Sequence, residues 1–225
     1  MNALRWLAGI RRHPSAILLL VQLAGLVLYP FLERTDVGRV ALGAFGIVVL
    51  LVTTRMVRRT PWLTWIAVGI ALPAILLLAL QAFVQAPFLH PLSSALEAVF
   101  YFYAAGSLIA YMLGDRHATT DELYCAGATF TLLAWAFTYT FLFLQAIQPG
   151  SFAAAVHPEQ ARTWTELTYL SFALLSSTGI GDVIPLTPQA RALASLEMFV
   201  GVMYLATVVS RLIGLTLAHP EPGGR

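Results

Sequence analysis

The sequence predicts an all-α membrane protein with six transmembrane helices and one shorter, re-entrant helix between the fifth and the sixth. Of its 225 residues, 59% are hydrophobic and only 11% are charged, whereas a soluble domain carries roughly 25% charge. So little polar surface cannot cover a water-soluble globule, and the excess apolar side chains must face lipid. The apolar residues are also gathered into runs of about 20, the length that crosses a bilayer as a helix.

Six such runs follow one another along the chain, and a helix is the form in which a single segment satisfies its own backbone in lipid. The predicted spans are Pro14–Leu32, Gly38–Val57, Trp62–Val84, Leu92–Leu113, Asp121–Gln148 and Pro188–Leu217. The basic residues before the first span are typical of a signal peptide, but Leu28–Phe31 follows in place of a small-residue cleavage site. We therefore expect the first span to be retained.

The segment Trp164–Leu175 is apolar but has only 12 residues, too few to span a membrane. Thr163 and Glu166 have the spacing of a capping box, with Thr163 as N-cap and the Glu166 side chain reaching back to it. A cluster of Ser, Thr and Gly follows the segment. Irregular backbone at membrane depth is tolerated only where protein buries it or where it lines water, so the pattern predicts a re-entrant half-helix followed by such a loop.

Every basic residue is an arginine, and the distribution of arginines predicts the orientation of the chain. With both termini in the cytoplasm, nine arginines lie inside and four lie outside. This bias favours a multi-pass protein of a plasma membrane, and the exclusive use of arginine favours a bacterial inner membrane. The half-helix and its loop then lie on the outer side.

The loop Leu175–Pro185 carries the residues with the clearest chemistry. Gly179 and Gly181, one residue apart, let the backbone alternate between conformations that other residues avoid. Such alternation turns successive carbonyl oxygens toward one axis, and four copies of the chain would stack rings of oxygens that replace the hydration shell of a cation. The Ser177 hydroxyl would add an inner ring, and the half-helix would point the negative end of its dipole toward the same axis.

This loop resembles the signature of the potassium-channel family, the pore-loop cation channels with a two-transmembrane ion-channel domain. The family filter reads Thr-Val-Gly-Tyr-Gly-Asp, between a pore helix and an inner helix. In this chain those six positions hold Ser177, Thr178, Gly179, Ile180, Gly181 and Asp182. The resemblance covers about Leu167–Gly214, and the first four spans match a six-span subunit only in number and length.

The resemblance implies a passive potassium channel, not an enzyme, that works as a homotetramer among membrane lipids. It needs no cofactor, and monovalent cations are what it transports. The carbonyls of Ser177, Thr178, Gly179 and Ile180 would coordinate potassium, and Gly181 would complete the filter. Gly201 lies 19 residues after Asp182, where the family has its gating hinge. Close packing against another helix is an equal alternative for a transmembrane glycine.

Three residues are expected to support the filter, namely Tyr169, Ser176 and Asp182. In the family the aspartate anchors the outer end of the filter, and the Tyr169 hydroxyl is placed to bind it. Glu197 lies inside the sixth span, where a carboxylate is costly and is a functional candidate. It could modulate the filter by pairing with Ser176 or by sensing protons, but we favour a hydrogen-bonded structural role.

The departures from the family pattern predict potassium preference with imperfect selectivity. Ile180 has no hydroxyl where the family has Tyr, Thr178 is polar where Val is usual, and Ser177 lacks the methyl group of Thr. Each change alters the packing behind the carbonyl rings. A non-selective cation channel and a non-conducting membrane subunit are therefore the alternatives.

An enzyme is a further alternative, because Gly179–Asp182 also fits the Gly-x-Gly-Asp signature of intramembrane aspartyl proteases. Such a protease needs a second aspartate at membrane depth. Asp36, Asp115 and Asp121 all lie in predicted loops or at helix ends, and Pro185 interrupts the helix that the protease would continue. The protease is thus disfavoured.

Three parts of the chain are expected. Residues 1–116 would form a peripheral four-helix transmembrane bundle, residues 117–217 the pore domain, and residues 218–225 a short cytoplasmic tail. The fourth span, Leu92–Leu113, contains no arginine, so this bundle is not a voltage sensor. The net charge of +2 is too small to indicate a nucleic-acid partner, and the single Cys125 excludes a disulfide framework.

Overall fold

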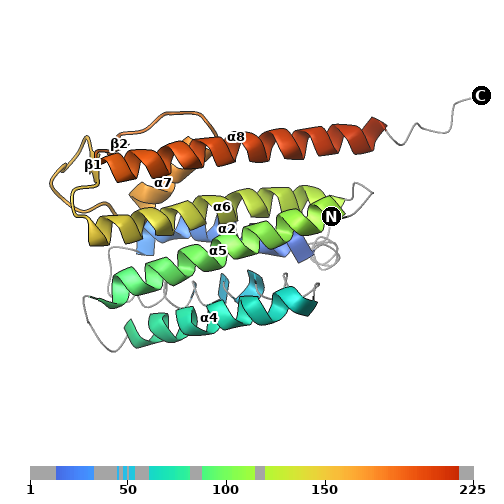
Figure 1. Ribbon diagram of the computed structural model, residues 1–225, viewed down its shortest axis with the longest axis horizontal. Coiled ribbons are helices and arrows are strands. Elements are labelled where there is room, and N and C mark those ends of the chain that lie inside the picture. The colour runs from blue at the N-terminus through green and yellow to red at the C-terminus, as the bar shows by residue number, and fades with distance from the viewer. Residues whose placement is uncertain are drawn as a thin grey trace, which may run out of the picture.

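The computed structural model describes residues 14–32, 45, 48–49, 51–53, 61–81, 88–114 and 120–217. Within these residues the chain is an elongated bundle of helices running side by side (Figure 1). The helices are α2 (Pro14–Leu32), α4 (Pro61–Gln81), α5 (Leu89–Gly114), α6 (Thr120–Ile147), α7 (Trp164–Leu175) and α8 (Pro188–Leu217), and the two strands are β1 (Phe152–Ala154) and β2 (Val183–Pro185).

The described helices agree closely with the predicted spans. α2, α7 and α8 have the predicted bounds, and both ends of α4, α5 and α6 lie within three residues of the predicted ends. The predicted second span, Gly38–Val57, lies largely outside the described residues. By length and composition, four described helices are able to cross a membrane: α2, α5, α6 and α8 as far as Arg211. The chain is thus a multi-pass, all-α membrane protein, and a total of six spans remains a prediction.

α4 is an apolar helix of 21 residues. This helix packs against α5. The Gln81 amide at its end donates to the Leu89 carbonyl over 3.1 Å and to the Ser93 hydroxyl over 2.7 Å. The end of α4 therefore lies beside the start of α5, as expected for two consecutive antiparallel helices.

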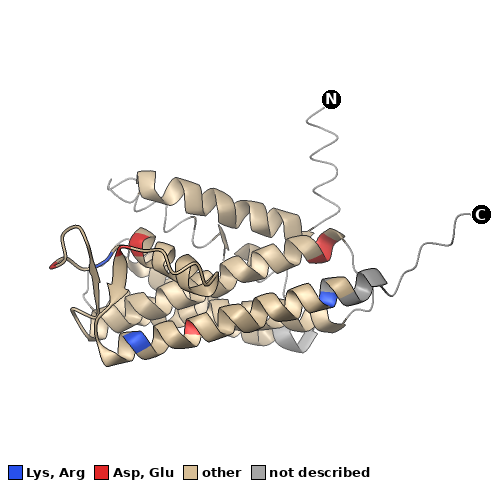
Figure 2. Ribbon diagram, turned by 90° about the horizontal axis from the view of Figure 1, so that it is seen from above, with Lys and Arg blue, Asp and Glu red and all other residues tan. Residues whose placement is uncertain are grey.

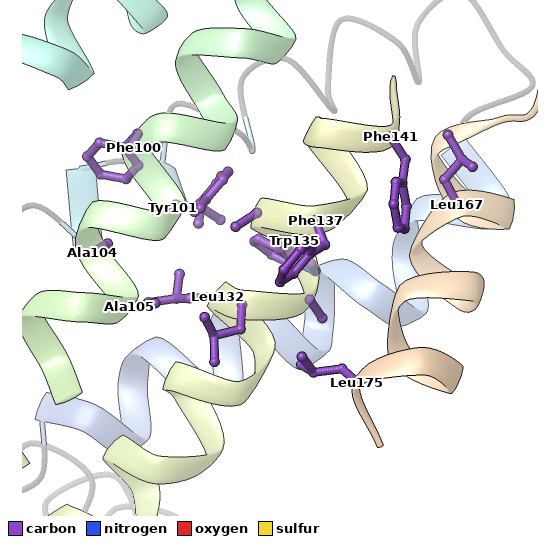
Figure 3. Close-up of a cluster of buried hydrophobic side chains, with 14 of the residues drawn as sticks. Phe100, Tyr101, Ala104, Ala105, Leu132, Trp135, Phe137, Phe141, Leu167 and Leu175 are labelled. Carbon is purple, nitrogen blue, oxygen red and sulfur yellow. The ribbon is translucent and has the colours of Figure 1, made fainter. Parts of the chain in front are cut away.

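α6 is the central helix of the bundle, since it contacts α5, α2, α7 and α8. Most of its buried side chains are small or aromatic. They are buried because other helices contact α6 on several sides. Figure 3 shows the resulting core, in which side chains of three helices gather: Phe100, Tyr101, Ala104 and Ala105 of α5, Leu132, Trp135, Phe137 and Phe141 of α6, and Leu167 and Leu175 of α7.

A series of aromatic contacts joins the peripheral helices to the start of α7. Tyr29 of α2 stacks on Trp164, with ring centroids 3.9 Å apart. Trp164 meets Trp135 of α6 edge to face at 5.9 Å, and Trp135 meets Tyr101 of α5 in the same way at 5.7 Å. Edge-to-face and stacked pairs are favourable beyond the area that they bury. The contacts show that α2 touches the start of α7, and that α5 is connected to it through Trp135 of α6.

The two ends of the bundle carry the polar contacts. Ser15, at the start of α2, donates from its backbone N–H and its hydroxyl to Asp121 over 3.2 and 2.9 Å. Arg211, near the end of α8, forms an ion pair with Glu122 over 3.3 Å. The start of α2, the start of α6 and the end of α8 therefore share one end of the bundle, and Figure 2 shows that charged residues gather mainly near the ends of the helices.

The strands β1 and β2 form a small antiparallel pair at the other end, where Ala153 lies opposite Ile184. The sequence analysis missed this pair. Each strand has only three residues, so neither shows the alternation by which a strand is recognised. The pair joins the loop that follows α6 to the segment that follows the Gly-rich loop.

Candidate ion-filter site

The re-entrant helix α7 begins with the predicted capping box. The backbone N–H of Glu166 donates to the Thr163 hydroxyl over 3.3 Å, and the N–H of Thr163 donates to the Glu166 carboxylate over 2.7 Å. This reciprocal arrangement satisfies two N–H groups that the first turn of a helix leaves without partners. The prediction is confirmed, and it fixes the residue at which α7 starts.

Arg162, the residue before the cap, is buried and binds several groups of the loop. This role was not predicted from the sequence. Its side chain is 1% exposed and pairs with Glu166 over 3.1 Å. The guanidinium also donates to the carbonyls of Gln160, His157 and Val156. In addition, Gln145 of α6 exchanges two hydrogen bonds with the Arg162 backbone. The loop between α6 and α7 is thus attached to both helices, and the spacing of Arg162 and Glu166 by four residues was the available signal.

The sign of φ alternates along the backbone after α7, but only one of the two predicted glycines takes part, because Gly179 has a positive φ and Gly181 does not. Ser177 has a φ of 58° and Gly179 a φ of 65°, whereas Thr178 and Ile180 stay at negative φ. Glycine reaches the left-handed region without a steric penalty, but a serine does not. Ser177 therefore stores backbone strain, and strained backbone in a structure points to a functional site.

The loop is attached to α7 through the carbonyl of Ala173. The backbone N–H groups of Thr178 and Gly179 donate to this oxygen over 3.1 and 3.2 Å. The Thr178 hydroxyl donates to the same oxygen over 3.2 Å and lies 3.1 Å from the Ser176 hydroxyl. These bonds direct the N–H groups of Thr178 and Gly179 back toward α7.

The Ser176 hydroxyl donates to the Phe172 carbonyl over 2.6 Å, and its role in supporting a filter remains a prediction. The polar group of Thr178 was expected to alter the packing behind the carbonyl rings. In the structure, its hydroxyl forms hydrogen bonds that attach the loop to α7.

Tyr169 lies behind the loop, as the resemblance implies. Its ring is close to Gly181, since a Cβ atom added there would lie 3.6 Å from the ring. Among the described residues no hydrogen bond joins the Tyr169 hydroxyl to Asp182, so that contact remains a prediction. The backbone of Asp182 is anchored instead, because its carbonyl accepts from the Ala155 N–H over 3.1 Å, next to the β1–β2 pair.

Gly201 lies against the end of α7. A Cβ atom added to it would lie 2.0 Å from the Leu175 carbonyl oxygen and 2.8 Å from the Leu175 Cα. No larger residue fits there unless a helix moves. Close packing, one of the two roles considered for Gly201, is therefore present in this structure, and a hinge at the same residue remains a prediction.

Glu197 is fully buried one helical turn before Gly201. Its carboxyl group is hydrogen-bonded to the hydroxyl of Ser171 of α7, not to Ser176. Ser171 also contacts the carbonyl of Ala134 of α6 over 2.7 Å. Three helices thus meet at Ser171, and no local pattern could have revealed a pair that lies 26 residues apart in the chain.

The loop and one face of α8 are exposed in the single chain. Ile180 is 71% exposed, and the half-exposed ring of Tyr169 lies beside the loop. The exposed apolar residues of α8 are Leu196, Met198, Phe199, Val202, Met203, Leu205, Val209 and Ile213. A large apolar surface next to a polar loop is typical of an interface with another protein or of contact with lipid.

Comparison with known proteins assigns the class of this site. Residues 132–217 match the family model described as "Ion channel", and this segment runs from within α6 through α7 and the Gly-rich loop to the end of α8. The comparisons with curated proteins and with solved structures found no match. This C-terminal segment is therefore similar to an ion channel domain of the pore-loop type, and a match to ion channels argues against an enzyme and hence against the aspartyl-protease alternative.

Proposed function

We propose that the chain is one subunit of a homotetrameric, potassium-conducting channel in which the carbonyls of Ser177–Ile180 coordinate the ions. The alternating backbone is the observation that carries this proposal. Positive φ at Ser177 and Gly179 comes directly after the C-terminal end of a half-helix. Backbone carbonyls arranged in rings can replace the hydration shell of potassium, and a helix C-terminus stabilises a cation nearby.

The exposed surfaces support a tetramer. The chain holds one such loop, and a ring of carbonyls requires several copies around an axis. The exposed apolar face of α8, together with Ile180 and the ring of Tyr169, provides surface for contact between these copies. The remaining apolar surface of the bundle would face membrane lipids.

The arrangement of the helix ends supports a topology with both termini in the cytoplasm of a bacterium. The start of α2 and the end of α8 lie at the same end of the bundle, next to the start of α6. The β1–β2 pair and the Gly-rich loop lie toward the opposite end. The excess of arginine in the predicted inner segments gives the same orientation.

Relaxed selectivity belongs to the same proposal. Ile180 offers no hydroxyl behind the filter and is largely exposed in the single chain. Its counterpart in the family forms hydrogen bonds there. The hydroxyl of Thr178 compensates in part, because it adds bonds at the inner end of the loop. We therefore expect potassium to permeate better than sodium, but with a smaller ratio than in a channel with the full family signature.

Ion flux from lipid vesicles tests this function. Vesicles that contain the purified protein and are loaded with potassium should release it into a potassium-free medium, and should release sodium more slowly. The Gly179→Ala variant should stop the flux, because alanine strongly resists a φ of 65°.

Gly150→Ala is the matched control for this experiment. Gly150 has a φ of 78° and, like Gly179, has no atom within 4 Å of an added Cβ. The backbone penalty is therefore similar, but the residue lies in the outer loop, and the flux should persist. Equal release of both ions would indicate a non-selective cation channel. No release from vesicles that hold folded tetramers would favour a non-conducting subunit.

A further inference from the structure

Glu197 is a buried residue of α8 to which the proposed conduction through the filter assigns no role. It is 0% exposed and lies within the part of α8 that is able to span a membrane. Carboxylates at such a depth are rare and usually have a partner and a function. Its location, one turn before Gly201, brings it to the contact between α8 and α7.

The hydrogen bonds around Ser171 determine which group must donate. The Ser171 hydroxyl contacts two oxygens, one on Glu197 and the other the carbonyl of Ala134. A serine hydroxyl has one hydrogen, and a carbonyl oxygen only accepts. Both contacts are satisfied together only if Ser171 donates to Ala134 and Glu197 donates to Ser171. Glu197 must then be the neutral acid, carrying a hydroxyl.

The second oxygen of Glu197 agrees with this arrangement. It is buried and has no hydrogen-bond partner within the described part of the chain. A carboxylate would leave a share of its negative charge there without any donor, which is costly in an apolar environment. A neutral acid leaves only an uncharged carbonyl oxygen.

The chain of hydrogen bonds ends next to the residues that hold the filter. Ser171 precedes Phe172 and Ala173 in α7, and these two carbonyls accept the bonds from Ser176, Thr178 and Gly179. One turn further along α8, Gly201 touches the Leu175 backbone. A shift of α7 relative to α6 or α8 would therefore move the inner end of the loop directly.

We propose that Glu197 is a positioning residue for the filter, which as a neutral acid donates to Ser171 and so fixes α7 between α6 and α8. This inference rests on the proposed function, since it assigns a role in holding the potassium filter. Glu197 itself does not touch the ion. It acts through Ser171, and through the end of α7 that bears the loop.

Substitutions at Glu197 and Ser171 test the proposal, with the potassium-to-sodium permeability ratio in planar bilayers as the readout. Glu197→Gln should keep the wild-type ratio, because its amide group can also donate to Ser171. Glu197→Leu should lower the ratio at least about fivefold, the factor that corresponds to one ordinary hydrogen bond. Ser171→Ala should lower the permeability ratio by a similar factor. Because this substitution is small, it tests the same hydrogen bond if Glu197→Leu fails to fold.

Glu97→Leu is the matched control, since Glu97 is also buried in a membrane helix but belongs to the peripheral helix α5. Its ratio should equal that of the wild type. The proposal is overturned if Glu197→Gln lowers the ratio as much as Glu197→Leu does, because the charge would then be essential. A wild-type ratio in both Glu197→Leu and Ser171→Ala would also overturn it.

An infrared difference spectrum separates this proposal from the proposed function. At neutral pH the wild-type protein should show the carbonyl band of a protonated carboxylic acid that disappears in Glu197→Gln. The absence of that band would contradict the neutral acid, even if the channel conducts potassium selectively. A wild-type protein that passes no potassium but shows the band would contradict the proposed function. The neutral, hydrogen-bonded state of Glu197 would still hold in that case.

Discussion

Thr178 shows how a single side chain changes the support of the filter. Its hydroxyl bonds the Ala173 carbonyl and the Ser176 hydroxyl, and a net hydrogen bond contributes about 1 kcal/mol. We expect Thr178→Val to destabilise the inner end of the loop and to lower the potassium-to-sodium permeability ratio, although valine is the residue of the family. Thr178→Ser keeps the hydroxyl and should retain the ratio. A higher ratio in Thr178→Val would contradict this account.

Gly201 gives a second prediction about one residue. In an unobstructed helix, alanine is about 1 kcal/mol more favourable than glycine. At Gly201 an added Cβ would collide with the Leu175 backbone, and such overpacking costs about 1–3 kcal/mol. Gly201→Ala should therefore lower the thermal unfolding temperature in detergent.

Gly106→Ala is the comparison for that experiment, because Gly106 lies in α5 and an added Cβ meets no atom within 4 Å. It should leave the unfolding temperature unchanged or raise it. If the two variants were equally stable, Gly201 would not be confined by α7, and its role as a free hinge would gain support.

The Gly-rich loop could be recognised in the sequence, but the contacts around it could not. The spacing of Gly179 and Gly181 identifies the loop, because few other residues adopt the required backbone. The contact between Glu197 and Ser171 depends on how α8 crosses α7, which no local pattern encodes. The positive φ of Ser177 was missed for a related reason, since serine has no intrinsic preference for that conformation.

At the scale of the elements, α7 is held at both ends. The capping box and Arg162 fix its start, and the contact with Gly201 fixes its end. Its bounds were predictable because a capping box precedes the helix and the cluster of Ser, Thr and Gly follows it. The β1–β2 pair was not, because three-residue strands are stabilised by their pairing and not by any pattern of their own.

The contacts of Arg162 lead to a prediction about the stability of the loop between α6 and α7. Replacing it with alanine removes a buried guanidinium that pairs with Glu166 and binds several carbonyls of the loop. Hydrogen bonds that involve a charged group contribute about 1.5–3 kcal/mol, so Arg162→Ala should destabilise the protein by on the order of 3 kcal/mol, measured by thermal unfolding. The control is Arg191→Ala, because Arg191 is exposed and donates to the Pro185 carbonyl over 3.2 Å. Equal, small effects would show that the loop does not depend on Arg162.

At the scale of the whole molecule, α2 and α5 pack on α6 of the same chain, and α4 packs on α5. α5 and α6 are in extensive contact, and only five residues separate Gly114 from Thr120. Such a link spans less than about 20 Å, so α5 and α6 must be neighbours. The sequence predicted where the described helices lie along the chain but not which of their faces meet, because lipid-facing and protein-facing apolar residues look alike in sequence.

The exposed face of α8 leads to a prediction about assembly. Its apolar residues are exposed in the single chain, and the proposed function requires several copies of the loop around one axis. Native mass spectrometry in mild detergent should therefore find a complex of four times the 24.5-kDa chain mass. A monomer at every concentration that retains its helical content would contradict the tetrameric pore.

The central claim is that Ser177–Ile180 forms a potassium filter, and the reversal potential tests it most directly. Purified protein would be placed in a planar bilayer with potassium on one side and sodium on the other. The account predicts a reversal potential displaced from zero toward the potassium equilibrium potential, with Gly179→Ala silent and Gly150→Ala like the wild type. A reversal potential at zero with clear single-channel steps, or one displaced toward sodium, would contradict a potassium filter in this loop.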